Sequence, residues 1–581
     1  MKIYPYLAIL MLLPGLLVRA GDIGEAVGFP QRVYDADYFE QHLTGLEDAL
    51  AAENWDWQAL EDALQGLRYF SYLGDTKTLQ DASLKRLAIS LAGLAIHSGF
   101  KANDAKAWRA QEQYAVLAYR YFPLKSLSSQ WSNALPVIFS LLGQTLAASD
   151  DTQKAYAWWE NIRHLAFMAY QARNVPALKS ALMQRHELPA LLLERIQSSN
   201  GWQLDHLVWT LAYYHILLDE QTQRALDIAL LAALEANPGL SREDKKRLFS
   251  QRYLVNSFRG KQSCEDEYAA YCLIPDESEV LPHTHVCREG LHIRYKQISE
   301  TDLSRLCASL GAQEGGFHAL LATAHKPVAN DFNDRLEVLI FDDYSDYNLA
   351  GALLFDIGTD NGGMYIEGTP SDPDNQARFF TFRMFWQRQP FGVWNLKHEY
   401  IHYLDGHFAA YGAFNHFPSH MVWWAEGLAE WLAEGEHNSK LQKLLQDTKP
   451  EDVPSLETIF AARYEDGLDL TYRWSYLAWR FLASRQPQTL AQLAVLLRQD
   501  FFDGYLRALE QLADEQETAF QHFVGTVRNQ DPVPDNKPSG NYLGRYLYRS
   551  YLQPPQLGVD EQHFHLLQAL PPSESRMAGQ L

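Results

Sequence analysis

A His-Glu-x-x-His motif at residues 398–402 limits the folds open to this chain more than any other stretch. The apolar and aromatic residues around it are typical of a largely buried helix. On such a helix His398 and His402 lie one turn apart on the same face, where two neutral imidazoles can bind one zinc ion. Glu399, between them, is placed to act as a general base toward the attacking water. The alternative is a buried helix whose histidines are satisfied by neighbouring side chains.

A second helical pattern at residues 423–430, Trp-Trp-Ala-Glu-Gly-Leu-Ala-Glu, supplies the carboxylates that such a site needs. Glu426 is predicted as the third protein ligand, which leaves the fourth position open as in catalytic zinc sites. Glu430, one turn further on, is predicted to accept a hydrogen bond from the outer N–H of a ligand histidine. A solvated helix face would explain Glu430 as well. A helix with the motif followed by a helix with the glutamate is the gluzincin pattern of zinc peptidases.

Three stretches together resemble the peptidase unit of bacterial collagenases of the Vibrio type. They are His-Glu-Tyr-Ile-His-Tyr-Leu-Asp-Gly at 398–406, the pattern at 423–430, and Asp-Asn-Gly-Gly-Met-Tyr-Ile-Glu-Gly at 360–368. The resemblance runs from about Phe29 to about Arg528. It implies a zinc metalloendopeptidase that acts on collagen or gelatin, with a thermolysin-like α+β gluzincin peptidase domain.

The whole chain is long enough to form more than one domain. Helical periodicity dominates its first half. Apolar residues recur at helical spacing over 84–94, 115–122, 135–148, 155–172, 204–218 and 226–236. We therefore predict a mainly α protein with a smaller mixed α/β part, in which residues 21–258 form an α-solenoid of helical hairpins. The resemblance implies that this region is an activator-like domain. Without the resemblance it could equally be a scaffold or a partner-binding array.

The other expected boundaries follow changes in composition. Residues 1–20 combine a basic start, an apolar run too short to cross a bilayer, and small residues before the expected cleavage site. We read them as a signal peptide and expect a secreted protein. Residues 259–335 are a cysteine-bearing joint, residues 336–530 the peptidase domain with a helical helper part, and residues 531–581 a linker and tail.

All four cysteines lie in the joint. Export permits disulfides, and an even number fits two bridges. Of the three possible pairings we favour Cys264 with Cys272 and Cys287 with Cys307, because short loops close most readily. There is no Cys-x-x-Cys pair, which argues against a zinc site built from cysteines. The His-Thr-His stretch at 283–285 is predicted as a loop feature rather than a metal site.

A Gly-Gly pair leads into an alternating strand at residues 361–368. Such a pair lets another backbone approach closely, and an edge strand near a zinc site can bind an extended peptide as an additional strand. An ordinary turn and strand is the alternative. The predicted substrate-binding residues are Gly362, Gly363, Met364, Tyr365 and Ile366. The resemblance also implies that Glu367 contributes to a calcium site, for which a carboxylate oxygen is suited.

Tyr472 resembles the tyrosine that assists the transition state in this family, and Tyr476 is the second candidate. A hydroxyl aimed at the cleft would stabilise the oxyanion of the tetrahedral intermediate, although core packing explains either residue. Three further histidines, His407, His416 and His420, lie between the two metal-ligand helices. We predict structural or cleft-lining roles for them, because a fourth protein ligand would close the site. His407 stands where Vibrio-type collagenases usually have arginine.

A net charge of −22 argues against a nucleic-acid partner. We expect a monomer with Zn²⁺, and with Ca²⁺ as a second ion, that cleaves collagen, gelatin or other extended peptides. Residues 531–581 are too few for the recruitment modules that many collagenases carry, so gelatin is the more secure substrate. The alternatives are a gluzincin of broader specificity and a helical-repeat binding protein with a non-catalytic zinc centre. Glu399 argues against the latter, because a structural site needs no general base.

Overall fold

The computed structural model describes residues 35–53, 55–74, 78–121, 130–144, 152–384 and 391–530. The expected signal peptide and the tail from residue 531 lie outside these residues. The described chain forms two compact units, a first that ends at Pro238 and a second that begins at Gly239. The division thus falls earlier in the chain than the boundary expected at residue 258. The prediction of a mainly helical protein with a smaller mixed part is confirmed.

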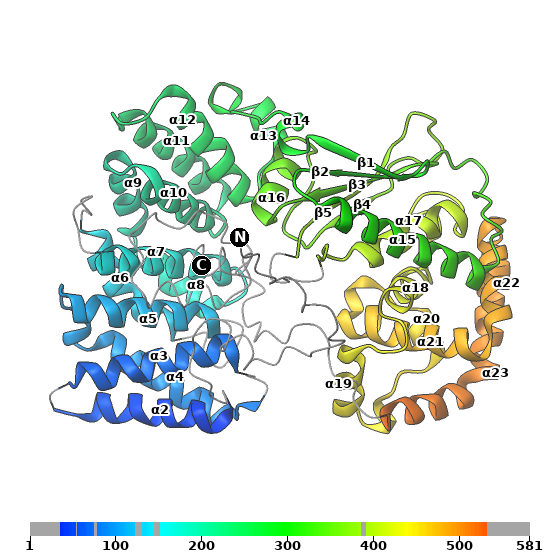
Figure 1. Ribbon diagram of the computed structural model, residues 1–581, viewed down its shortest axis with the longest axis horizontal. Helices are drawn as coiled ribbons and strands as arrows, with labels where there is room; N and C mark the ends of the chain where they lie inside the picture. Colours follow the sequence, from blue (N-terminus) through cyan, green and yellow to red (C-terminus); the bar gives the residue numbers. More distant parts are fainter. Residues whose placement is uncertain are drawn as a thin grey trace, which may run out of the picture. The chain divides into compact units, whose positions relative to one another are not determined.

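The first unit is helical throughout its described residues, and neighbouring helices pack against one another (Figure 1). Contacts run from α2 to α3, from α3 to α5, from α5 to α7 and from α7 to α10. Their bounds are α2 Ala36–Ala51, α3 Trp57–Leu73, α4 Asp81–Ile96, η2 Gly99–Lys101, α5 Ala105–Tyr121, η4 Trp131–Ala134, α6 Leu135–Leu142, α7 Thr152–Ala172, α8 Pro176–Met183, α9 Leu188–Ser198, α10 Gly201–His215 and α11 Glu220–Ala236. Large aromatic side chains fill the interfaces, among them the fully buried Trp159 and Trp209.

A mixed five-stranded sheet lies in the second unit, in the order β1-β2-β3-β5-β4. The strands are β1 His283–Arg288, β2 Leu291–Tyr295, β3 Leu336–Phe341, β4 Met364–Ile366 and β5 Ala377–Phe382. The strands β2, β3 and β5 run parallel, while β1 and β4 pair antiparallel with their neighbours. Strand β3 lies at the centre of the sheet, and β4 forms one edge of it.

The loop predicted at residues 283–285 is wrong, because these residues begin strand β1. His283 pairs with Tyr295, and His285 pairs with Ile293 of β2. The strand has a largely exposed face at the edge of the sheet. Polar residues can occupy such a face, since an antiparallel sheet can leave one side in water.

The remaining helices of the second unit surround this sheet and continue beyond it (Figure 1). They are α12 Arg242–Arg247, η5 Leu248–Leu254, η6 Val255–Ser257, α13 Lys261–Glu265, η7 Ala269–Tyr271, α14 Glu277–Val280, α15 Glu300–Leu321, α16 Tyr344–Leu353, α17 Leu396–Phe408, α18 Val422–Glu434, α19 Ser439–Asp447, η8 Pro450–Asp452, α20 Leu456–Phe460, η9 Tyr464–Asp466, η10 Asp469–Trp474, α21 Ser475–Arg485, α22 Pro487–Arg498 and α23 Phe502–Arg528. Helix α12 begins after Ser241, whose side chain forms a reciprocal capping box with that of Asp244.

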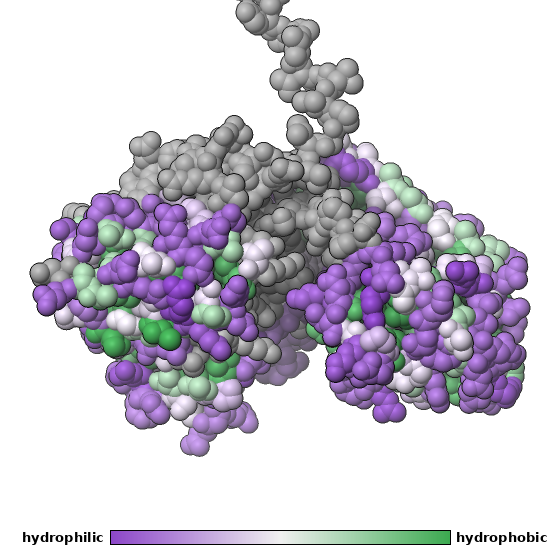
Figure 2. Space-filling view, turned by 90° about the horizontal axis from the view of Figure 1, so that it is seen from below, coloured by the Kyte–Doolittle hydropathy of each residue, from purple (hydrophilic) through white to green (hydrophobic). Residues whose placement is uncertain are grey.

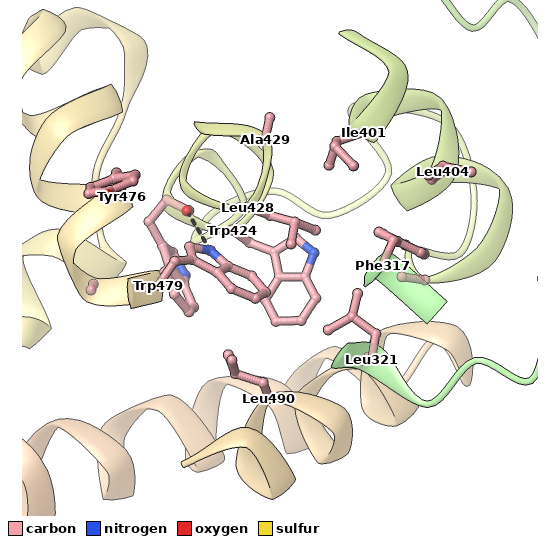
Figure 3. Close-up of a cluster of buried hydrophobic side chains, with 14 of the residues drawn as sticks. Phe317, Leu321, Ile401, Leu404, Trp424, Leu428, Ala429, Tyr476, Trp479 and Leu490 are labelled. Atoms are coloured by element: carbon pink, nitrogen blue, oxygen red, sulfur yellow. Dashed lines mark hydrogen bonds between the residues drawn. The ribbon is translucent and has the colours of Figure 1, made fainter. Parts of the chain in front are cut away.

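An aromatic core joins α15, α17, α18, α21 and α22 (Figure 3). Trp424 lies at its centre, and its indole N–H donates to Asp405 Oδ1 at 2.9 Å. Gly427 lets α18 and α21 approach closely, because a β-carbon there would lie 2.4 Å from Trp479 Cδ1. Helix α18, which follows the His-Glu-x-x-His motif in the chain, is therefore held in place by dense packing against α21.

Both favoured disulfides, Cys264–Cys272 and Cys287–Cys307, are present. Among the described helices, none is long and apolar enough to cross a membrane. On the face shown in Figure 2, hydrophilic residues dominate the described surface and hydrophobic residues are scattered among them. Isolated apolar side chains of this kind are normal for a protein surface.

Candidate metal centre

Helix α17 carries the motif and lies between the sheet and α18. It begins after Asn395, whose φ of 51° turns the chain sharply into the helix. Gln313 of α15 donates from Nε2 to the carbonyl oxygen of Lys397 at 2.8 Å, which satisfies a backbone group near this entry. Tyr400 and Ile401 are fully buried. One face of the helix is therefore locked into the core, while His398 and His402 share the other face.

His398, His402 and Glu426 converge at one point between α17 and α18. His398 Nε2 lies 3.1 Å from His402 Nε2 and 3.1 Å from Glu426 Oε2. His402 Nε2 lies 3.6 Å from the same carboxylate oxygen. For tetrahedral zinc with bonds of about 2.0–2.1 Å, two ligand atoms lie about 3.3 Å apart. The nature of the donors and their mutual distances therefore both fit a zinc ion.

Glu426 divides its two oxygens between the histidines and a tyrosine. While Oε2 faces the imidazoles, Oε1 accepts a hydrogen bond from the Tyr464 hydroxyl at 2.7 Å. Groups that bond a ligand from behind fix its orientation toward the metal. Tyr464 therefore positions the carboxylate, a role that our sequence analysis missed. The residue lies in the short segment η9, where no periodic pattern marks it.

Glu430 lies beside the first histidine of the motif, His398. Its Oε1 is 3.6 Å from His398 Nδ1, which is an ion-pair distance and longer than a hydrogen bond. Its Oε2 accepts from Asn438 Nδ2 at 3.1 Å. The carboxylate is thus held beside the ring, and a small rotation would bring it into hydrogen-bond range.

The charges of the three converging residues are strongly coupled. Burial opposes ionisation of His402, yet the neighbouring Glu426 carboxylate raises its pKa to about 9. Burial also works against the Glu426 carboxylate, but His402 and His398 hold its pKa well below its ordinary value. The ionised Glu426 carboxylate and the protonated His402 imidazole therefore attract each other. A divalent cation can replace that positive charge.

Two further predicted residues, Glu399 and Tyr472, lie beside this cluster. The Tyr472 ring centroid is 6.1 Å from that of His398. Burial raises the pKa of the Tyr472 hydroxyl, and the charges of Glu426 and Glu399 add to this rise. The hydroxyl therefore stays protonated at neutral pH and can donate a hydrogen bond. Tyr476, the second candidate, instead donates to the Gly435 carbonyl oxygen at 2.6 Å.

The edge strand β4 contacts α17, and its Tyr365 ring lies 6.3 Å from the Tyr403 ring of that helix. Gly363 enters the strand at a φ of 132°, which side-chain-bearing residues rarely adopt. A β-carbon on Gly362 would lie 2.1 Å from Trp394 Nε1, so the chain passes directly against this indole. The Gly-Gly pair therefore permits the close approach of the Trp394 indole to this segment.

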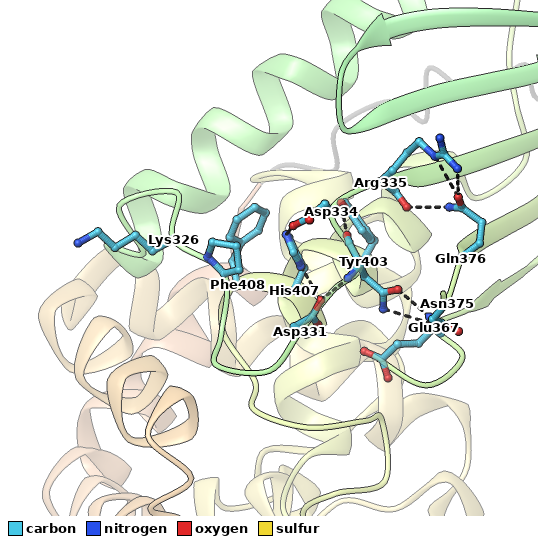
Figure 4. Close-up of polar contacts among 12 residues, drawn as sticks. Lys326, Asp331, Asp334, Arg335, Glu367, Asn375, Gln376, Tyr403, His407 and Phe408 are labelled. Atoms are coloured by element: carbon cyan, nitrogen blue, oxygen red, sulfur yellow. Dashed lines mark hydrogen bonds and ion pairs between the residues drawn. The ribbon is translucent and has the colours of Figure 1, made fainter. Parts of the chain in front are cut away.

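A polar network connects Glu367, the residue after β4, to helix α17 (Figure 4). The backbone oxygen of Glu367 accepts from Asn375 Nδ2 at 2.7 Å and from Asn333 Nδ2 at 3.3 Å. The Tyr403 hydroxyl donates to the Asn333 carbonyl oxygen at 3.0 Å. The strand edge and the histidine pair are thereby held in a fixed relation.

The Glu367 side chain is buried, and its Oε2 accepts from the Phe414 backbone N–H at 2.7 Å. Burial raises the pKa of this carboxyl to about 7, with Asp331 and Asp405 contributing in the same direction. Among the described residues, no group of three or more metal-ligand side chains includes Glu367. A calcium ion here would therefore need backbone oxygens or water as its other ligands.

The three other histidines near the site have partners of their own. His407 Nδ1 lies 2.8 Å from Asp331 Oδ1, and its ring stacks on Tyr403. His416 Nε2 lies 2.7 Å from Asp500 Oδ1. His420 Nδ1 lies 2.8 Å from its neighbour's hydroxyl, Ser419 Oγ. None of them belongs to a metal-ligand group among the described residues.

Comparisons with known proteins match the second unit and, for one relative, a longer part of the chain. Residues 248–523 match a family model described as collagenase. A microbial collagenase of Vibrio alginolyticus is 37% identical over 251 residues, 43% of this chain and 30% of that protein. One of Vibrio parahaemolyticus is 31% identical over 428 residues, 70% of this chain and 50% of that protein. A collagenase of Clostridium tetani is 22% identical over 282 residues, 46% of this chain and 28% of that protein. The chain spans half or less of the length of these relatives.

Proposed function

We propose that this chain is a zinc-dependent endopeptidase that hydrolyses collagen and gelatin, because residues 248–523 match a family model described as collagenase. The convergence of His398, His402 and Glu426 carries the proposal, since their spacing suits tetrahedral zinc with one open position. When bound there, zinc would supply the Lewis acid that polarises the scissile carbonyl and activates water. We further propose that the second unit has the gluzincin fold and that the stacked helices of the first form a solenoid.

Glu399 is the general base in this proposal. It lies next to a proposed metal ligand, and its charge contributes to the raised pKa of both Tyr472 and Tyr464. It takes the proton of the attacking water and delivers it to the leaving amine. The protonated Tyr472 hydroxyl donates to the oxygen on which negative charge develops. Tyr464 holds Glu426 in place during both steps.

The edge strand β4 aligns the substrate in this proposal. It pairs with β5 on one side only, so its other side can accept an extended peptide. The residues that would contact the peptide backbone are Gly362, Gly363, Met364, Tyr365 and Ile366. A collagen triple helix exposes no free strand of this kind without local opening. We therefore propose that unfolded chains such as gelatin are cleaved faster than intact triple helix.

A calcium ion at Glu367 is a subordinate proposal. The chemistry is suitable because one carboxylate oxygen, Oε2, already accepts from Phe414, while Oε1 remains for a cation. Calcium would also relieve the cost of burying this charge near Asp331 and Asp405. We expect calcium to raise the melting temperature of the wild type and to have no such effect on Glu367→Gln.

Parallel hydrolysis assays on gelatin and on triple-helical collagen test the proposal. The assays compare the full chain, Glu399→Gln, the exposed-site control Glu457→Gln, and enzyme treated with a zinc chelator. We expect cleavage by wild type and control, and a loss of about 10²-fold or more in Glu399→Gln. Zinc content should stay at wild-type level in Glu399→Gln, since this residue is not a ligand.

Other outcomes separate the alternatives. Equal cleavage of unrelated unfolded proteins would indicate a peptidase of broader specificity. Stoichiometric zinc without hydrolysis of any substrate would replace the peptidase proposal with a helical-repeat binding protein. Detection of the chain in the medium, cleaved after residue 20, would support the proposed secretion. A single species in sedimentation would support the expected monomer.

A further inference from the structure

A second group of histidine and carboxylate side chains lies at the end of α15. Glu314 and His318 are one helical turn apart, and His325 follows the helix after a short turn. One ligand atom from each residue lies within 4.8 Å of the others. The His318 and His325 ring centroids are 3.7 Å apart. The chain therefore folds back so that the second imidazole lies against the first.

His318 has a ring nitrogen with no hydrogen-bond partner. The side chain is almost fully buried, and Nδ1 lies 2.5 Å from Thr323 Oγ1. Nε2 is buried without a hydrogen bond, and the nearest carboxylate oxygen, Glu314 Oε1, is 3.7 Å away. Leaving a buried polar atom unsatisfied costs on the order of 1–3 kcal/mol. An atom in this state is one that a metal ion would stabilise.

Glu314 also has one oxygen engaged and one facing the histidine. Its Oε2 accepts from Arg288 Nη2 at 2.5 Å and from the Tyr400 hydroxyl at 2.8 Å. These bonds fix the carboxylate and leave Oε1 on the side of His318. The ion pair with Arg288 therefore does not use the oxygen that a cation would need.

We propose that Glu314, His318 and His325 form a second zinc site, separate from the one at His398 and His402. Two imidazole nitrogens and one carboxylate oxygen suit zinc, whereas calcium and magnesium prefer oxygen ligands alone. The present separation of up to 4.8 Å exceeds the edge of about 3.3 Å for tetrahedral zinc. His325 is exposed and is the ligand that can move inward to close this difference.

Zinc at this position would fasten the turn after α15 to the helix itself. The turn contains Ala322, Ala324 and His325 at positive φ, and these values are unusual for residues other than glycine. Glu314 in turn accepts a hydrogen bond from the Tyr400 hydroxyl of helix α17. The proposed ion is thus a structural clamp, and it does not depend on the proposed peptidase function.

The group of His285, Cys287 and Cys307 provides a contrast. It also brings three potential ligands together, but the two cysteines are joined in a disulfide. Their sulfur atoms are therefore not available as thiolates. Of the three groups that the described residues contain, two can bind zinc.

Zinc content after equilibration with buffered free zinc tests this proposal. We expect about two ions per wild-type chain, one in His325→Ala, and two in the exposed-histidine control His437→Ala. His402→Ala should also retain one ion, and the double variant His325→Ala, His402→Ala should retain none. Since the readout is metal content, it separates this proposal from the peptidase proposal.

A cobalt-loaded sample gives a second measurement. Cobalt bound by two imidazoles and a carboxylate absorbs visible light, so His402→Ala loaded with one equivalent should still show these bands. The double variant His325→Ala, His402→Ala should lack these absorption bands. One zinc per wild-type chain, or two in His325→Ala, would overturn the proposal. His325 is exposed, so its replacement should leave the fold intact, which circular dichroism would verify.

Discussion

Two buried histidines, one in each unit, lie in opposite surroundings. In the first unit, His164 of α7 is fully buried near the rings of Tyr114 and Trp131. Burial there lowers its pKa to about 3. In the second unit, His402 is also buried, but the facing Glu426 raises its pKa to about 9. The two pKa values differ because one ring faces aromatic side chains and the other faces a carboxylate.

The surroundings of a buried histidine determine whether its ring is neutral or charged. A neutral imidazole among rings contributes packing, and it is stable only while it stays uncharged. An imidazole beside a carboxylate is held in a charged cluster that a cation can replace. Substitutions at the two positions should therefore have different effects: those at His402 should alter metal binding and activity, and those at His164 should alter stability.

Replacement of a proposed metal ligand should have the largest effect. We expect His402→Ala to lower peptidase activity to background and to remove one zinc ion, because two ligands cannot hold the ion. Helix content by circular dichroism should be unchanged. His416→Ala, which alters a histidine paired with Asp500 instead, should keep activity and zinc. Peptidase activity in His402→Ala would contradict the role in metal binding that distinguishes His402 from His164.

Loss of the Tyr472 hydroxyl should have the next largest effect. We expect Tyr472→Phe to lower kcat by about 10²–10³-fold while KM and zinc content stay unchanged, because the hydroxyl acts on developing charge. Steady-state kinetics on a peptide substrate would measure this. Tyr476→Phe is the matched control, since its hydroxyl bonds the Gly435 carbonyl. An equal kcat loss in the control would assign the effect to packing.

Loss of the Tyr464 hydroxyl should act on metal affinity. We expect Tyr464→Phe to weaken zinc binding by about 10–100-fold, because Glu426 loses the group that orients its carboxylate. Competition with a chelator of known affinity would measure the change. Excess zinc should restore most of the activity. A lowered kcat at saturating zinc would instead indicate that Tyr464 contacts the substrate.

The pH dependence of stability should reveal His164. Its folded pKa of about 3 lies below the unfolded value of about 6.5, so stability is present above pH 6.5 and is lost as pH falls toward 3. Between pH 6.5 and pH 5 the loss amounts to about 1.6 kcal/mol, or about 16-fold in the unfolding constant. Denaturant titrations at several pH values would measure it. His164→Leu should flatten this part of the profile and leave zinc content unchanged.

Much of this arrangement could be predicted because local patterns decide it. The strand at 336–341 and the helices around 398–402 and 423–430 have clear hydrophobic periodicity. The two short-range disulfides follow from the ease of closing short loops. The proximity of Glu426 to the histidines follows from two helices that must pack against each other. In each case the sequence separation is small or the pattern is long.

The features that escaped prediction depend on contacts that no periodic sequence pattern marks. Tyr464 reaches Glu426 from a segment without periodicity, so only the folded chain reveals the bond. His325 reaches His318 through a turn at positive φ that no glycine signals. The strand at 283–285 was missed because its exposed residues do not alternate with apolar ones. The contacts made in the folded chain determine these positions, and the local sequence preferences do not reveal them.

The open edge of the sheet has a consequence for the behaviour of the protein in concentrated solution. A free strand edge that can pair with a peptide can also pair with the same edge of another molecule, which is a common route to aggregation. Strand β4 has only three residues, and Gly363 departs from extended geometry at its start. So short an edge offers few hydrogen bonds to a second copy. Lengthening β4 to improve binding would therefore be expected to lower solubility.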